Sequence, residues 1–412
     1  MNAKKIMTAA SAASLAVVAS AEVMDRPKGI EIGEHLTLRP YVSLSYTYDS
    51  NVDSTKHSKA GSQWVVNPGL GAEYLSENWK VSGAVWYQYH AYNRYSHQLN
   101  SSSYGEFLKL DWADSLPNER GWRVMFNERF QQISQDDDMS NDKGRGVGRD
   151  RKQFEANGVV ERRLNEYWHA DAEASYYLLD YDNDVKKYAP LYGWKRATAG
   201  GEIGFAPSPW TDFILAANYQ WYWQDNGGRS GTTNIRSDSR GWTIMGGIAT
   251  RATERIEYRV LGGWSRFKYA DGADTINGWT YQVSGKWQIS DTLNAMVLGS
   301  SYYQPSEYQY GTAIKVHTIS GGLGKSFVRG KVTSSLDLAF RREAREYSVS
   351  SANDYDRDIW TARVGLNYVL NRFVTLFGRV EYQFSDTHGE KVGGHYYDYD
   401  RWRATVGMRL TY

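Results

Sequence analysis

Histidine and serine are the residues of this chain that could serve as catalytic base and nucleophile. A hydrolase needs these groups and an orienting partner within hydrogen-bond reach. The eight histidines form no recognisable motif with a serine, and the polar neighbours of His90 and His169 are those of a wet interior. Cysteine is absent, which excludes disulfides, thiol catalysis and cysteine-based metal sites. We expect no enzyme activity and no cofactor.

Charged residues gather in one segment, 135–150, with the sequence QDDDMSNDKGRGVGRD. A calcium loop is excluded by the spacing, because the segment lacks the alternating ligands and terminal glutamate of a hand-type site. The segment is either a solvated surface loop or a constriction loop folded into a channel. The candidate constriction residues are Asp136, Asp137, Asp138, Lys143, Arg145 and Arg149.

Tyrosine and aspartate alternate in three further stretches, at 180–184, 354–358 and 396–402. Such stretches could bind sugars by ring stacking and carboxylate hydrogen bonds. Alternatively, the rings anchor a membrane interface, where amphipathic aromatic side chains are enriched.

The elements that must carry these residues are strands. Apolar and polar residues alternate without a slip in 36–49, LTLRPYVSLSYTYD, and the pattern recurs in 81–92, 279–289 and 359–370. About eighteen such runs occur, most of roughly 11–14 residues, whereas soluble strands average ~5–6 residues and tilted membrane strands need ~9–11. The pattern predicts an all-β fold, a transmembrane up-and-down antiparallel β-barrel.

The connections between these runs alternate between short and long. Short ones lie at 76–78, 165–167, 252–255, 290–292 and 371–372. Long ones lie at 50–62, 135–150, 226–239 and 388–400, all on the same side of an up-and-down order. Short periplasmic turns and long extracellular loops are typical of outer-membrane barrels.

Tryptophans open many of the predicted strands, which is typical of two aromatic girdles at the membrane interfaces. Those after long connections are Trp64, Trp194, Trp242, Trp279, Trp360 and Trp402, and those after short ones include Trp79, Trp122 and Trp168.

The N-terminus has the pattern of a bacterial export signal. Two lysines precede a mild apolar run, and the small residues at 19–21 form a cleavage site. We therefore expect a signal peptide at 1–21, a short periplasmic lead at 22–35 and an outer-membrane barrel at 36–412. An open sheet edge is not tolerated in hydrocarbon, so the last strand must pair with the first. The expected partners are outer-membrane lipid and the barrel assembly machinery, which would read the strand that ends at Tyr412.

A barrel of about eighteen strands is wide enough for an aqueous channel. Its inward positions predict two charged walls, which would set ion selectivity as charged rings do in other pores. Alternatively, the charges pair locally with cross-strand neighbours. The basic wall comprises Arg39, Arg363, Arg379, Arg401, Arg403 and Arg409, and the acidic wall comprises Glu155, Glu161, Asp171, Glu173, Glu202 and Asp212.

The stretch RPYVSLSYTYDSNV, with Tyr48, Asp49, Ser50 and Asn51, resembles the opening of the putative beta-barrel porin 2 family. This resemblance implies a bacterial outer-membrane barrel that is either porin-like or exports an exopolysaccharide. It transfers no catalytic residues.

The leading hypothesis is a porin-like channel for hydrophilic solutes. The alternatives are exopolysaccharide export with polysaccharide-export components as partners, an adhesive or structural barrel, and an outer-membrane enzyme. Lys+Arg 48 nearly balances Asp+Glu 47, so nucleic acid is not an expected partner.

Overall fold

The computed structural model describes most of the chain between residues 29 and 412. The described ranges are 29–52, 60–93, 100–114, 121–133, 150–181, 193–224, 238–269, 275–305, 312–348, 355–389 and 398–412. The predicted signal peptide at 1–21 lies outside them. Within these ranges, no helix is long and apolar enough to cross a membrane.

The described residues form one sheet of 19 antiparallel strands, of which 18 close into a barrel. The first strands are β1 (Ile30–Ile32), β2 (Leu36–Asp49), β3 (Gly61–Leu75), β4 (Trp79–Tyr92), β5 (Ser101–Ala113), β6 (Trp122–Ile133), β7 (Arg151–Arg163), β8 (Trp168–Tyr181), β9 (Trp194–Ser208) and β10 (Thr211–Gln224). The others are β11 (Ser239–Thr253), β12 (Ile256–Tyr269), β13 (Thr275–Ser290), β14 (Leu293–Pro305), β15 (Thr312–Phe327), β16 (Val332–Ser348), β17 (Tyr355–Val369), β18 (Val374–Gly389) and β19 (Tyr399–Thr411). Within the described residues, the 3-10 turn η2 (Val328–Gly330) joins β15 to β16. The predicted barrel and its strand number are confirmed.

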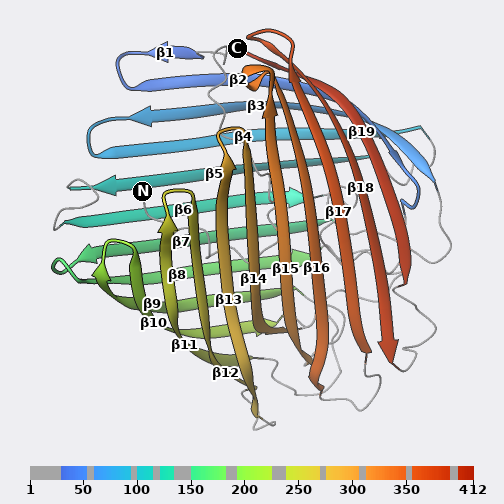
Figure 1. The fold of residues 1–412 in the computed structure, drawn as a ribbon. Coiled ribbons are helices and arrows are strands. Elements are labelled where there is room, and N and C mark those ends of the chain that lie inside the picture. The colour runs from blue at the N-terminus through green and yellow to red at the C-terminus, as the bar shows by residue number, and fades with distance from the viewer. Residues whose placement is uncertain are drawn as a thin grey trace.

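The two ends of the barrel differ in their connections. At the turn end, residues such as 76–78, 209–210, 254–255 and 291–292 join neighbouring strands. At the opposite, loop end, strands are joined by segments as long as 134–150 and 225–238. The segregation expected from sequence is therefore present. In Figure 1, strands β2 to β9 form the far wall and cross β13 to β19 of the near wall at a large angle, as expected when barrel strands tilt.

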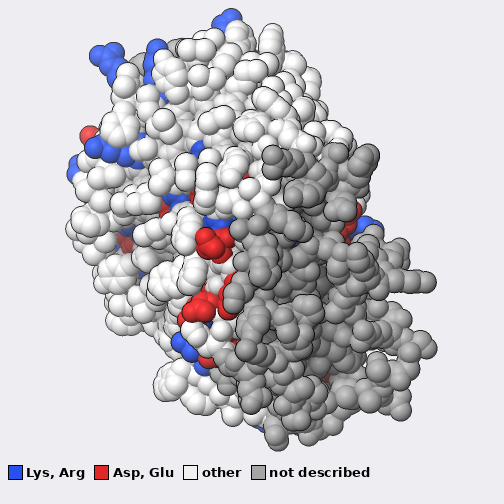
Figure 2. Space-filling model, turned by 90° about the vertical axis from the view of Figure 1, so that its right-hand side faces the viewer, with Lys and Arg blue, Asp and Glu red and all other residues white. Residues whose placement is uncertain are grey.

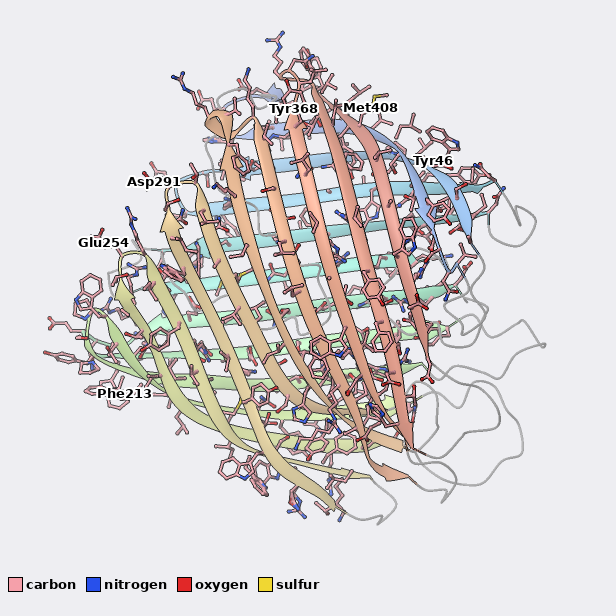
Figure 3. All side chains as sticks on the ribbon, turned by 45° about the vertical axis from the view of Figure 1, so that its right-hand side comes forward. Tyr46, Phe213, Glu254, Asp291, Tyr368 and Met408 are labelled. Carbon is pink, nitrogen blue, oxygen red and sulfur yellow. The ribbon has the colours of Figure 1, made fainter. Side chains whose placement is uncertain are left out.

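Every second side chain of a barrel strand points away from the interior, and in this chain these outward side chains are mostly apolar. Phe213, Leu215 and Val406 are more than half exposed on this surface. Phe213 projects outward, whereas Glu254 and Asp291 lie in short turns (Figure 3). Figure 2 shows a broad uncharged sector with lysine and arginine at its upper left edge. Such a band suits contact with hydrocarbon.

The predicted aromatic girdles need one correction. Trp64, Trp279 and Trp402 lie exposed on the outer face, as a girdle requires. Trp194 is only 5% exposed, because it shares the inward face of β9 with Arg196 and packs inside the barrel. A tryptophan that opens a strand reaches the interface only when its register position points outward.

The first and last barrel strands close the wall. β19 pairs with β2 from Arg403 opposite Asp49 to Thr411 opposite Tyr41. Beyond the end of β19, β1 pairs with the same edge of β2, with Ile32 opposite Leu36. This short strand, within residues predicted to be a lead, covers backbone groups of β2 that β19 does not reach, which an exposed edge would leave unpaired.

Tyr412 follows the last strand and is fixed at the seam. Its N–H donates to the carbonyl of Pro40 at 3.1 Å, and its ring stacks on Phe373 with centroids 5.9 Å apart. We expect Tyr412→Ala to lower the amount of protein in the outer membrane, because the terminal strand both completes the wall and carries the expected assembly signal. Quantitative immunoblotting of outer-membrane fractions checks this, with Tyr382→Ala, another outward tyrosine, as control. Equal amounts of both variants would contradict the role of Tyr412.

Candidate functional site: the barrel interior

At the loop end, β14 separates from β13, while β15 stays paired with β16. β14 pairs with β13 only as far as Ser300 opposite Gln282. β14 and β15 stay paired to each other as far as Pro305 opposite Ala313. The loop-end part of this hairpin, residues 301–305 and 312–316, is named the inner hairpin.

The inner hairpin packs on the inward side chains of β8 to β13. The hydroxyl of Tyr222 donates to the carbonyl of Tyr303 at 2.9 Å, and the ring of Phe267 lies 6.3 Å from that of Tyr303. Ala313 is fully buried in the same cluster. The cluster comprises Tyr177, Leu179, Tyr181, Trp194, Tyr222, Phe267, Ile276, Tyr303 and Ala313. This aromatic cluster fills the loop-end interior on that side of the barrel.

A cavity of about 340 Å³ lies nearer the turn end, lined by residues from β4 to β13. Along β8, its lining residues Asp171 and Glu173 precede the aromatic Tyr177. Apolar Met245 and Val159 share the lining with Lys109 and Gln282. The cavity therefore has a mixed polar and apolar lining and lies beside the part of the interior that the aromatic cluster fills.

Four residues of the predicted acidic wall line this cavity. Asp171 on β8 lies directly opposite Glu161 on β7 and Glu202 on β9. Glu173 lies two residues further along β8 and also lines the cavity. Arg259 reaches Glu202 across two strands, with Nη2 2.5 Å from Oε2. The structure thus brings these four carboxylates together.

The other two residues of the predicted acidic wall lie outside the cavity lining. Glu155 faces Arg129 and Tyr177 across its neighbouring strands. Asp212 is hydrogen-bonded to His169 near the turn end, with Oδ2 of Asp212 2.7 Å from Nε2 of His169.

Most residues of the predicted basic wall have carboxylate partners. Arg39 bonds to Glu73 and Arg363 to Glu381, each at 2.7 Å. The guanidinium of Arg409 lies 5.5 Å from the ring centroid of Tyr41. Arg379 lies between Gly365 and Thr405 in the register. Part of this basic wall is therefore paired locally with carboxylates on neighbouring strands. Local pairing of this kind is the alternative to two free charged walls.

Arg401 and Arg403 join the basic wall to the barrel seam. Asp49 is fully buried and receives both Nε and Nη2 of Arg401, while Nε of Arg403 lies 3.2 Å away. The N–H of Asn51 also donates to Asp49 at 3.0 Å. This seam cluster, Asp49, Asn51, Arg401 and Arg403, links the first and last strands.

The candidate constriction residues, Asp136, Asp137, Asp138, Lys143, Arg145 and Arg149, lie outside the described residues. The inner hairpin is the inward-folded element that the structure does describe, and sequence reasoning missed it. No sequence signal marks it, because adjacent bulky rings such as Tyr302 and Tyr303 also occur at Tyr176 and Tyr177 in a fully paired strand. Among the described residues, no group of three or more His, Cys, Asp and Glu side chains is placed to hold a metal ion.

The chain is similar to several solved structures at low sequence identity. The outer membrane protein OpdK from Pseudomonas aeruginosa is 12% identical, with 91% of this chain and 99% of that chain covered and a TM-score of 0.43. OccAB3 from Acinetobacter baumannii is 8% identical, with 91% and 99% covered and a TM-score of 0.44. The siderophore receptor PirA from Pseudomonas aeruginosa is 8% identical, with 91% and 80% covered and a TM-score of 0.44. At these identities and TM-scores, the similarity supports no statement about the function of this chain.

No curated protein matches the chain. Residues 212–412, from β10 to the C-terminus, match the family model described as Putative beta-barrel porin 2. The stretch at 48–51 that first suggested this family lies outside the matched residues. The chain is therefore similar to the putative beta-barrel porin 2 family over residues 212–412, just under half of its length.

Proposed function

We propose that the protein is an outer-membrane channel for small hydrophilic solutes, inserted with its turn end in the periplasm. The closed barrel, its apolar outer band and the family match support a barrel of the outer membrane. The observation that carries the channel function is the cavity inside the wall, which several carboxylates line. A purely structural barrel would gain nothing from carboxylates held together there.

The inner hairpin favours small solutes over a polymer. It and the aromatic cluster occupy the loop-end interior beside β8 to β13. A cavity of about 340 Å³ is in the range of small-molecule sites, which measure roughly 300–1,000 Å³. Export of an exopolysaccharide would need the hairpin to move away from the cluster.

Single-channel recording of purified protein in a planar bilayer tests the proposal, because an aqueous path must conduct ions in KCl. We expect Arg363→Gln combined with Arg379→Gln to shift the zero-current potential toward that of a cation-selective pore. The Debye length falls from about 8 Å at 0.15 M salt to about 3 Å at 1 M, so the shift should shrink at high salt.

Substitutions in the acidic wall should have the opposite effect on ion selectivity. Glu155→Gln combined with Asp171→Asn should shift the zero-current potential toward that of an anion-selective pore. Unchanged potentials for both pairs would show that the charges act only as local pairs. The absence of conductance in correctly folded protein would overturn the channel function itself.

A further inference from the structure

The cavity wall contains a buried amide whose hydrogen-bonding groups have no partner among the described residues. Asn157 on β7 is 6% exposed and lines the cavity. Neither its amide nitrogen nor its amide oxygen finds a hydrogen-bond partner among the described residues. An unsatisfied buried polar group costs about 1–3 kcal/mol, so this side chain is suited to a partner that enters the cavity. A side-chain amide can both donate and accept.

The carboxylates beside Asn157 exceed the arginines that contact them. Five carboxylates line the cavity: Asp111, Glu161, Asp171, Glu173 and Glu202. Arg259 pairs with Glu202, and Arg123 pairs with Asp111. Like charges directly opposite one another on neighbouring strands are destabilising. A positive group in the cavity would therefore relieve repulsion among Glu161, Asp171 and Glu202.

The nature of that positive group follows from the wall. Since the described residues offer no metal-holding cluster, a hydrogen-bonding organic cation fits better than a metal ion. An ammonium has three donors for carboxylate and amide oxygens. Lys80 and Lys109 line the same cavity from β4 and β5, at a distance of several strands from Asp171. An anionic group at the far end of the solute would face these lysines.

We infer that the cavity binds a small solute through its ammonium group, with Asn157, Asp171 and Glu173 as the partners of that group. This inference rests on the proposed channel function, because it places the site in the solute path. A solute with an ammonium at one end and an anionic group at the other matches both sides of the cavity.

Four probes with four carbon atoms each separate the contribution of the ammonium group from those of carboxylate and hydroxyl groups. They are 1,4-diaminobutane, 4-aminobutanoate, 1,4-butanediol and succinate. Isothermal titration of the detergent-solubilised protein should detect binding of both amines, with 4-aminobutanoate at least as tight as the diamine. The same amines should reduce single-channel current. Equal or tighter binding of butanediol or succinate, or no binding of either amine, would overturn the inference.

Three variants locate the site. Asp171→Asn and Glu173→Gln should each weaken amine binding about tenfold, the effect of one charge-assisted hydrogen bond. Asn157→Leu should weaken it as well while leaving barrel stability equal or higher, because the amide has no partner to lose. Asp337→Asn removes an inward carboxylate from β16, outside the cavity lining, and serves as the matched control.

The titrations distinguish this site from the channel function. Amine binding without conductance in KCl would overturn the channel and leave the site, whereas conductance without amine binding would overturn the site and leave the channel. Equal weakening by Asp337→Asn and Asp171→Asn would show a general charge effect and overturn the assignment to these residues.

Discussion

Asp49→Asn should destabilise the barrel by about 3–5 kcal/mol, the usual cost of leaving a buried charge without its partner. Asp49 is fully buried and Arg401 is 1% exposed, so water cannot replace the lost interaction. The substitution removes the counter-charge from Arg401 and Arg403 while keeping the shape of the side chain. Because these residues join β2 to β19, the loss should act on closure of the barrel.

Urea titration of the protein in lipid vesicles, followed by tryptophan fluorescence, measures this effect. Asp291→Asn is the matched control, because Asp291 lies 3.6 Å from Arg255 in an exposed turn and such pairs contribute little. Asp49→Leu combined with Arg401→Met should recover part of the loss, since apolar replacement of both partners is often tolerated. A change below about 1 kcal/mol for Asp49→Asn would contradict a stabilising seam cluster.

Ala313→Asp should release the inner hairpin and raise single-channel conductance. Ala313 is fully buried against the aromatic cluster, where a carboxylate would have to be desolvated. That cost is of order 3 kcal/mol or more, comparable to the apolar contacts of one or two side chains. The hairpin has left β13 at this point, whereas β15 stays paired with β16 as far as Thr312 opposite Ser348, so the hairpin must move together with the loop end of β16.

Conductance in 1 M KCl, compared between wild type, Ala313→Asp and Ala252→Asp, checks the prediction. Ala252 is exposed near the turn end and receives the same charge without burial. Tyr222→Phe provides a milder test, because it removes the hydroxyl that bonds to the carbonyl of Tyr303 and to Gln220 but keeps the ring, and it should increase current fluctuations. Unchanged conductance in a folded Ala313→Asp barrel would show that the inner hairpin does not restrict the path.

The sequence by itself determined the barrel. Alternation in 36–49 and its repeats reports which side of each strand meets lipid, and this property depends only on neighbouring residues along one strand. The order of short and long connections is likewise local. For the same reason the inward position of Glu202 and Asp171 could be predicted from their place in a strand.

The tertiary structure alone decided what happens inside the barrel. Tyr303 and Ala313 lie far along the chain from Tyr177 and Tyr222, and no periodicity records that they meet. The departure of β14 from β13, the inward place of Trp194 and the unpaired amide of Asn157 all depend on packing between strands that are distant in sequence. Alternation specifies the face of a side chain, whereas the partner of that side chain across a wide interior is set by the closure, tilt and bending of the whole wall.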